Sequence, residues 1–152
     1  MTPEVIAALN ASVGAHLTAI ETYTDFAACA KAYGFSKLAD HWQGEADDER
    51  SHLARLLDRL EFLDAEENWE HLPPAENDDD PLAAVTAALS LEQAAAQIER
   101  DGYAAALAAG DPGSADVFLA NLKASEESVY QLKGWLRAVE RVGADNWLAN
   151  QA

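Results

Sequence analysis

The chain is poor in the residues that build disulfide frameworks, membrane spans and secretion signals. Its 152 residues include one cysteine, Cys29, which excludes an intrachain disulfide and a metal cluster held by several thiolates. Cys29 lies in an alanine-rich stretch, where we expect a small core residue. No run reaches the roughly 18 apolar residues of a membrane span. Because no basic-plus-apolar segment at the start indicates a signal peptide, we expect a cytoplasmic protein that makes no membrane contact.

Basic residues are also scarce. Ten Lys and Arg stand against 27 Asp and Glu, which gives a formal charge of −17. A surface with this charge repels phosphate, so we expect neither nucleic acid nor anionic membrane as a partner. The same charge attracts cations.

Helix-forming residues are abundant. Hydrophobic residues make up 49% of the chain, with much Ala and Leu and few β-branched runs. This composition and length predict an all-α protein with one domain, residues 1–152. Capping residues, Pro and Gly predict helices from Pro3 to about Tyr33, from about Ser36 to about Leu63, from Pro81 to Gly110 and from Pro112 to Gly143, then a short helix at 145–148. Thr2, Ser36 and Asp80 are the expected N-caps.

A long acidic connection, residues 64–80, separates the second and third helices and contains Pro73 and Pro74. Fully extended, it reaches up to ~56 Å, whereas the second helix is ~42 Å long. The connection can therefore run the length of the bundle, so that the third helix starts parallel to the second. This topology is the ferritin-like four-helix bundle with one long crossover between helices 2 and 3. We expect Trp69 and Leu72 to pin the loop to the bundle or to be buried in a subunit contact.

Polar residues interrupt the apolar seam of the second helix near its middle. The seam advances in steps of four and three residues, and its central members are Glu45, Glu49 and His52. Glu49 and His52 lie three residues apart on one helical face and can bind one ion. Glu-x-x-His facing a bundle core is the ligand pattern of di-iron carboxylate bundles.

The other helices bring polar residues to the same level: His16 on the first, Glu92 on the third, and Ser125 with Ser128 on the fourth. Buried carboxylates beside imidazoles are costly without a cation. We therefore predict a metal site, with iron as the expected ion and zinc as the alternative. Its predicted ligands are His16, Glu49, His52 and Glu92. A buried hydrogen-bonded network without metal is the other interpretation.

Six motifs together make the chain resemble the bacterioferritins. They are Val5-Ile6-x-x-Leu9-Asn10, Ala19-Ile20-x-x-Tyr23, Glu45-x-Asp47-Asp48-Glu49-x-x-His52, Arg59-Leu60-x-Phe62-Leu63, Leu89-x-Leu91-Glu92 and Val142-Gly143-Ala144-Asp145-Asn146-Trp147-Leu148-x-x-Gln151. Their joint spacing covers almost the whole chain. The resemblance implies dimers that assemble into hollow 24-subunit shells storing iron, a di-iron ferroxidase site in each bundle, and haem between paired subunits.

The resemblance carries over only in part. Glu49, His52 and Glu92 match family ligands, and Tyr23 matches a tyrosine near the site. The family has a glutamate at the position of His16, a Glu and a His at those of Ser125 and Ser128, and a haem-ligating methionine at that of Arg50. Met1 is the only methionine, so we expect no haem of the usual kind. Each residue turns a helix by about 100°, so Glu126 and Glu127 point away from the seam. They therefore do not replace the Glu and His that are missing at Ser125 and Ser128.

Three functional interpretations remain open. The first is an iron-storing, bacterioferritin-like protein whose ferroxidase site is altered and slow or inactive. The second is a non-catalytic shell subunit that co-assembles with an active bacterioferritin paralogue, because the second Glu-x-x-His and the haem methionine are both missing. The third is a ferritin-fold protein with a new mononuclear site made of two His and a carboxylate. Histidine at position 16 favours the third, since a decaying site has no reason to gain a good ligand.

Overall fold

The computed structural model describes residues 2–152, and within them every regular element is an α-helix. The elements are α1 (Pro3–Ala32), α2 (Ser36–Phe62), α3 (Pro81–Ala108), α4 (Pro112–Val142) and α5 (Ala144–Ala149). The prediction of an all-α four-helix bundle with a short C-terminal helix is confirmed. That residues 1–152 form one domain stays a prediction.

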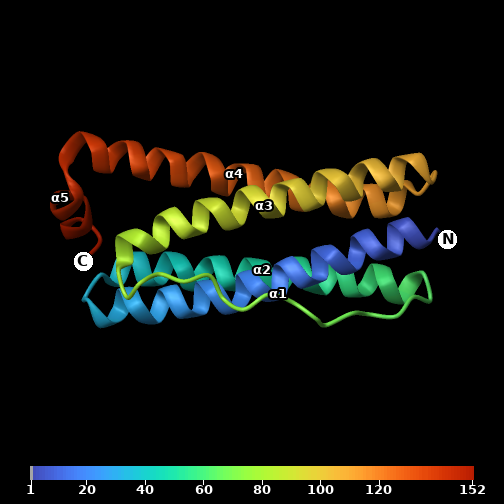
Figure 1. Cartoon of the computed structure of the whole chain (residues 1–152), viewed down its shortest axis with the longest axis horizontal. Coiled ribbons are helices and arrows are strands. Elements are labelled where there is room, and N and C mark those ends of the chain that lie inside the picture. Colours follow the sequence, from blue (N-terminus) through green and yellow to red (C-terminus); the bar gives the residue numbers. More distant parts are fainter. Residues whose placement is uncertain (1) are drawn as a thin grey trace.

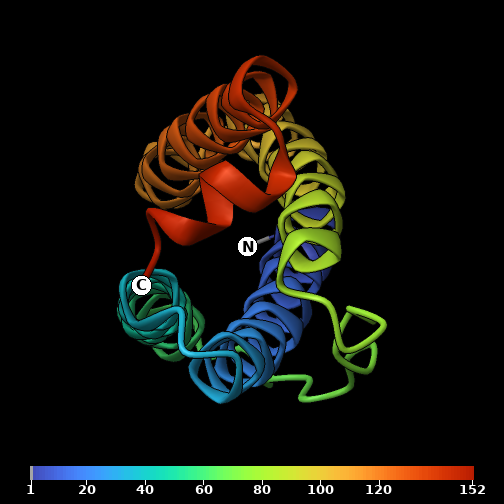
Figure 2. The same cartoon turned by 90° about the vertical axis from the view of Figure 1, so that its left-hand side faces the viewer.

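The long connection spans the bundle, as predicted. Figure 1 shows it leaving the end of α2 and running back along the molecule, so that α3 starts parallel to α2. α1 packs chiefly against α2, α3 packs against α4, and α1 also contacts α3. Contact between α2 and α4 is slight, and Figure 2 shows α5 crossing one end of the bundle between these two helices.

The predicted helix ends are nearly right. Asp80 caps α3, since its side chain accepts a hydrogen bond from the backbone N–H of Leu82 at 3.0 Å. Thr2 occupies the N-cap position of α1 without a side-chain cap bond. The prediction that Ser36 is an N-cap is wrong by one residue, because Ser36 is the first helical residue and Phe35 precedes it as the N-cap. Helix assignments commonly differ by this much at their ends.

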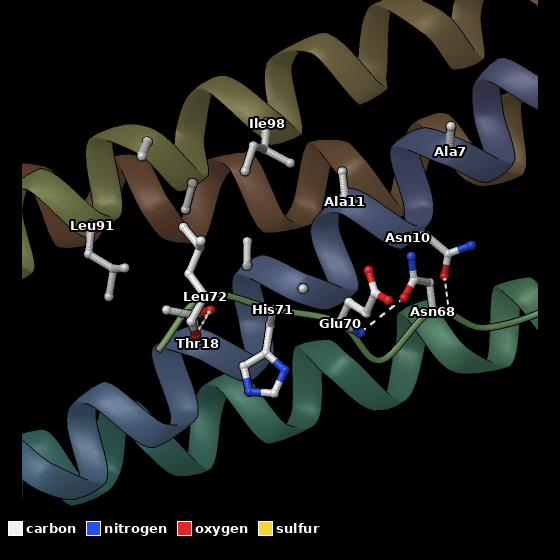
Figure 3. Close-up of a pocket in the computed structure, with 14 residues that line it drawn as sticks. Ala7, Asn10, Ala11, Thr18, Asn68, Glu70, His71, Leu72, Leu91 and Ile98 are labelled. Atoms are coloured by element: carbon white, nitrogen blue, oxygen red, sulfur yellow. Dashed lines mark hydrogen bonds between the residues drawn. The ribbon is translucent and has the colours of Figure 1, made fainter. Parts of the chain in front are cut away.

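Hydrogen bonds from α1 fix the 64–80 connection (Figure 3). The Asn10 amide donates to the Glu66 carbonyl at 3.0 Å and accepts from the Asn68 backbone N–H at 2.8 Å, and the Thr18 hydroxyl donates to the Leu72 carbonyl at 2.9 Å. The side chains of Trp69 and Leu72 stay 52% and 75% exposed. They do not pin the loop to the bundle of this chain, and their burial in a subunit contact stays a prediction.

The expectation that Cys29 belongs to the core is wrong. Its neighbours Ala27 and Ala30 are buried, but Cys29 is only partly buried. Its thiol lies 3.8 Å from the Asp79 carboxylate of the crossover connection. The position is turned away from the helix seam, so the side chain meets the loop instead of the bundle interior.

Two apolar clusters fill the bundle, one toward each end. Tyr23, Phe26 and Trp42 are buried in the cluster next to α5, and Leu9 and Phe118 in the cluster near the start of α1. Polar side chains from α1 to α4 are buried between them. Within residues 2–152, no helix is both long enough and apolar enough to cross a membrane.

One glycine allows α3 and α4 to come close. A Cβ atom added at Gly102 would overlap the ring of Phe118, which is fully buried. The close packing of α3 on α4 near this end therefore requires glycine, despite its low helix propensity.

Candidate metal centre

The orientation of His16 is set by the backbone of its own helix. Its ring Nδ1 lies 2.7 Å from the Ser12 carbonyl oxygen. Because a carbonyl only accepts, Nδ1 donates and carries the proton, which leaves a lone pair on Nε2 of the neutral ring. Nε2 lies 3.3 Å from Glu49 Oε2. Burial lowers the pKa of His16, which disfavours a second proton at Nε2, and nearby Glu49 only partly opposes this effect.

Glu49 lies between two imidazoles. Its Oε2 is 3.8 Å from Nδ1 of His52, and the rings of His16 and His52 meet edge to face with centroids 5.6 Å apart. One nitrogen of each histidine and one oxygen of Glu49 lie within 4.8 Å of one another. Glu49 is 9% exposed, and its Oε2 faces the two imidazoles at 3.3 and 3.8 Å. A buried carboxylate that faces a nitrogen lone pair is stabilised by a cation placed between them.

Glu92 belongs to a second group, which shares Glu49. Carboxylate oxygens of Glu45, Glu49 and Glu92 also lie within 4.8 Å of one another. The Tyr23 hydroxyl donates a hydrogen bond to Glu92. The structure therefore brings His16, Glu49 and His52 together, and it places Glu92 with Glu45 and Glu49 in a second group.

Burial makes the charges of the second group costly. Desolvation, followed by the nearby charge of Glu49, raises the pKa of Glu92 to about 8 and that of Glu45 to about 7. Burial also raises the pKa of Tyr23 well above its ordinary value, and the neighbouring Glu92 carboxyl adds to the effect. Tyr23 thus keeps its proton and remains a hydrogen-bond donor. A cation among the carboxylates would offset these penalties.

Glu99 adds a further carboxylate to this level. It is fully buried on α3, accepts a hydrogen bond from Ser12, and lies 3.8 Å from Nδ1 of His16. Its Oε2 and the Asn121 side-chain nitrogen are both buried without a hydrogen-bond partner among the described residues. Burial raises the pKa of Glu99 to about 7, and the hydrogen bond from Ser12 only partly opposes this rise.

An open cavity of about 590 Å³ lies on the α2–α4 side of the centre. Its lining includes Glu45, Glu49, His52, Ser128 and Glu127. Glu126 and Glu127 are exposed, in agreement with the expectation that they point to solvent. Glu127 nevertheless borders the cavity, so its carboxylate adds negative charge at the entrance.

A family model described as "Ferritin-like domain" matches residues 6–142. A bacterioferritin of Streptomyces coelicolor is 32% identical over 147 residues, which cover 97% of this chain and 88% of the relative. A protein of Pseudomonas aeruginosa named "Bacterial ferritin" is 32% identical over 158 residues, covering 98% of this chain and 97% of that protein. The chain belongs to the ferritin-like family, among the bacterioferritins.

Ser125 and Ser128 of α4 stand where the bacterioferritin resemblance leads us to expect a Glu and a His. Burial raises the pKa of Glu92 and of Glu45. Hydrogen bonding to the buried Ser125 slightly offsets the rise at Glu92, and hydrogen bonding to the half-buried Ser128 does the same at Glu45. The two serines thus serve carboxylates of α3 and α2. A serine hydroxyl is a far weaker metal ligand than the Glu and His that the family resemblance leads us to expect there.

The bacterioferritin resemblance places Arg50 where the family has its haem ligand. The residue is exposed, and its guanidinium forms an ion pair with Asp47 at 2.9 Å on the same helix. A guanidinium is always protonated and has no lone pair for haem iron. The donor at this position does not fit the haem of the family.

Sequence reasoning left two ligand-type residues of this bacterioferritin unused. Glu45 and Glu99 both fall on helix seams, so the periodicity shows that they face the bundle. Glu45 was placed beside Glu49 on its seam but was not counted as a ligand, and nothing in the sequence placed Glu99 beside His16. The signal that could have found them is the presence of a second acidic residue on each seam, one turn from Glu49 and two turns from Glu92.

Proposed function

We propose that this bacterioferritin binds Fe(II) through His16, Glu49 and His52 and stores iron. The observation that carries the proposal is the bare Nε2 of His16 held 3.3 Å from the buried Glu49 carboxylate. Two imidazoles and a carboxylate suit Fe(II) and Zn(II). The acidic cavity between α2 and α4 supports entry of a cation from that side.

Oxidation of the bound iron is slow or absent under this proposal. Ser125 and Ser128 leave α4 without a strong ligand, and Glu92 lies in a different carboxylate group from the two histidines. The residues present hold Fe(II) as substrate and cargo, and Tyr23 keeps the proton that it donates to Glu92. We therefore expect tight Fe(II) binding with slow or absent ferroxidase turnover.

Anaerobic Fe(II) titration of the metal-stripped protein, followed by air, tests this function. We expect tight Fe(II) binding that His16→Ala weakens by at least about tenfold, since even outer-shell changes cost a metal site about 10- to 100-fold. His71→Ala is the matched control, because His71 is exposed and pairs with Glu21 at 2.9 Å. Equal binding by both variants, or rapid oxidation by the unaltered protein, would contradict the proposal.

We also propose that the chain assembles with itself into a 24-mer shell built of dimers. Large apolar side chains that are exposed in the single chain support association, namely Phe62, Trp69, Leu72 and Tyr130. Native mass spectrometry measures the assembly. A stable monomer at micromolar concentration would refute it.

A non-catalytic subunit in a mixed shell is the second candidate, favoured by the serines on α4 and by Arg50. It predicts that co-expression with an active bacterioferritin paralogue gives mixed shells that oxidise Fe(II) in proportion to the paralogue's share. The isolated chain would then bind no iron tightly.

The purified protein should lack haem under either function, because Arg50 replaces the methionine. Absorbance in the Soret region, measured against protein concentration, checks this expectation. The cytoplasmic location likewise stays a prediction.

A further inference from the structure

We propose that His71 is a pH-sensitive latch, which in its protonated form holds segment 66–72 of the crossover connection against α1. Residues of this segment form one wall of an open cavity of about 760 Å³, whose other walls come from α1 and α3 (Figure 3). Release of the segment would therefore widen this cavity. The inference is independent of iron binding, because His71 belongs to neither of the two ligand groups of the metal centre.

Both ring nitrogens of His71 face atoms that only accept hydrogen bonds. Nδ1 lies 2.8 Å from the carbonyl oxygen of Trp69, and Nε2 lies 2.9 Å from the carboxylate Oε1 of Glu21 on α1. A neutral imidazole has one N–H, so it can serve one of these acceptors, and its other nitrogen then presents a lone pair to the second. Only the imidazolium donates both hydrogen bonds. The contacts are therefore those of the protonated ring.

The groups around the ring favour protonation as well. Glu21 is the carboxylate that faces the ring from α1, and Glu70 precedes His71 in the crossover connection. The α3 residues that line the cavity are apolar. The hydrogen bond to the Trp69 carbonyl, followed by the one to Glu21, raises the pKa of His71 above its ordinary value.

Neutral hydrogen bonds attach the segment to α1 on both sides of His71. The Asn10 side chain binds the backbone before it, and the Thr18 hydroxyl binds the backbone after it. A Cβ atom added at Gly14 would lie 3.0 Å from the Glu70 carbonyl oxygen, so the segment sits directly on the helix. Amide and hydroxyl side chains do not change protonation near neutral pH. The ring of His71 is therefore the attachment that responds to pH in this range.

The latch holds at low pH and weakens at high pH. Because the attached state raises the pKa of His71, it binds the ring proton more tightly than the released state does. The contribution is complete below the usual histidine pKa of about 6.5 and is lost as pH rises through the raised value. His71 and Glu21 are both exposed, and exposed ion pairs are weak, so we expect an effect of a few-fold.

Hydrogen–deuterium exchange of the full-length protein tests the latch, with mass spectrometry of peptides that cover residues 66–72. The unaltered protein is compared with His71→Ala at about pH 5.5 and about pH 8.5, on either side of the histidine range. The ratio of the two rates at one pH cancels the intrinsic pH dependence of exchange. We expect His71→Ala to exchange about two- to fivefold faster at the lower pH, and the ratio to fall toward one at the higher pH.

Two further variants test the pairing of the ring with α1. Glu21→Gln should reduce the pH dependence, since a glutamine amide accepts from the charged ring and donates to the neutral ring. Glu70→Gln is the matched control and should keep the full pH dependence, because Glu21 supplies the carboxylate that pairs with His71.

The same rate ratio at both pH values would overturn the latch, because the attachment would then not depend on protonation. A ratio of one at both pH values would overturn it as well. Equal loss of the pH dependence in Glu21→Gln and Glu70→Gln would overturn the specific pairing and indicate general attraction by the acidic connection. All three positions are exposed, so these variants should fold, and circular dichroism checks this.

Discussion

Replacement of Glu99 by glutamine should stabilise the metal-free protein at alkaline pH. Glu99 is fully buried beside Ser12 and His16, and burial raises its pKa to about 7. Glutamine has the same shape, can accept the Ser12 hydrogen bond, and offers an amide that rotates to suit Asn121. The substitution therefore removes the charge and keeps the contacts.

The direction of this stability change follows from the raised pKa of Glu99. The folded state binds the Glu99 proton more tightly than the unfolded state, so its contribution to stability is complete below pH 4.5 and is lost as pH rises through about 7. A rise from 4.5 to about 7 corresponds to roughly 3 kcal/mol at pH 8. Glu99→Gln avoids this loss. For a chain of this length, 1 kcal/mol shifts Tm by about 2–4 °C.

Thermal unfolding at pH 5 and pH 8, with chelator present, measures the effect. We expect Glu99→Gln to raise Tm by about 6–12 °C at pH 8 and to change it little at pH 5. Glu126→Gln, an exposed change on α4, should be neutral at both pH values. Equal destabilisation of Glu99→Gln at the two pH values would refute the reasoning, because it would show that the carboxylate is held ionised by its neighbours.

Two further predictions concern α3 and α4. Gly102→Ala should destabilise the fold by about 1–3 kcal/mol, because its Cβ would overlap the Phe118 ring. Gly134→Ala, where a Cβ meets open space, should stabilise the fold by up to about 1 kcal/mol. Urea unfolding compares the two variants, and equal effects would contradict the packing argument. The double change Ser125→Glu with Ser128→His should raise the rate of Fe(II) oxidation by about tenfold or more in stopped-flow absorbance, and an unchanged rate would show that the missing α4 ligands do not limit oxidation.

The sequence by itself determined most of the fold. Pro3, Pro81 and Pro112 begin helices and Gly34 and Gly110 follow them, because proline fits the first turn and glycine adopts the positive φ, here 82° and 70°, at a helix end. The length of residues 64–80 was enough to infer the crossover. Local rules and chain length suffice for these features.

The sequence also indicated which side chains would meet near the middle of the bundle. The period of 3.6 residues places His16, Glu49 and His52 on inward faces, and the structure brings them within 4.8 Å. Side-chain type then limits what they can bind, since histidine and glutamate are metal ligands. The resemblance to the family likewise led us to expect departures from its pattern at Ser125, Ser128 and Arg50.

Only the tertiary structure decided which carboxylates lie close to one another. Periodicity gives the face of a helix, but the axial level and the side-chain rotamers depend on how two helices pack. Helix packing and side-chain rotamers grouped Glu92 with Glu45 instead of with the histidines, and they placed Glu99 beside His16. Cys29 met the crossover loop for the same reason, because the path of the loop over α1 is a property of the packed molecule.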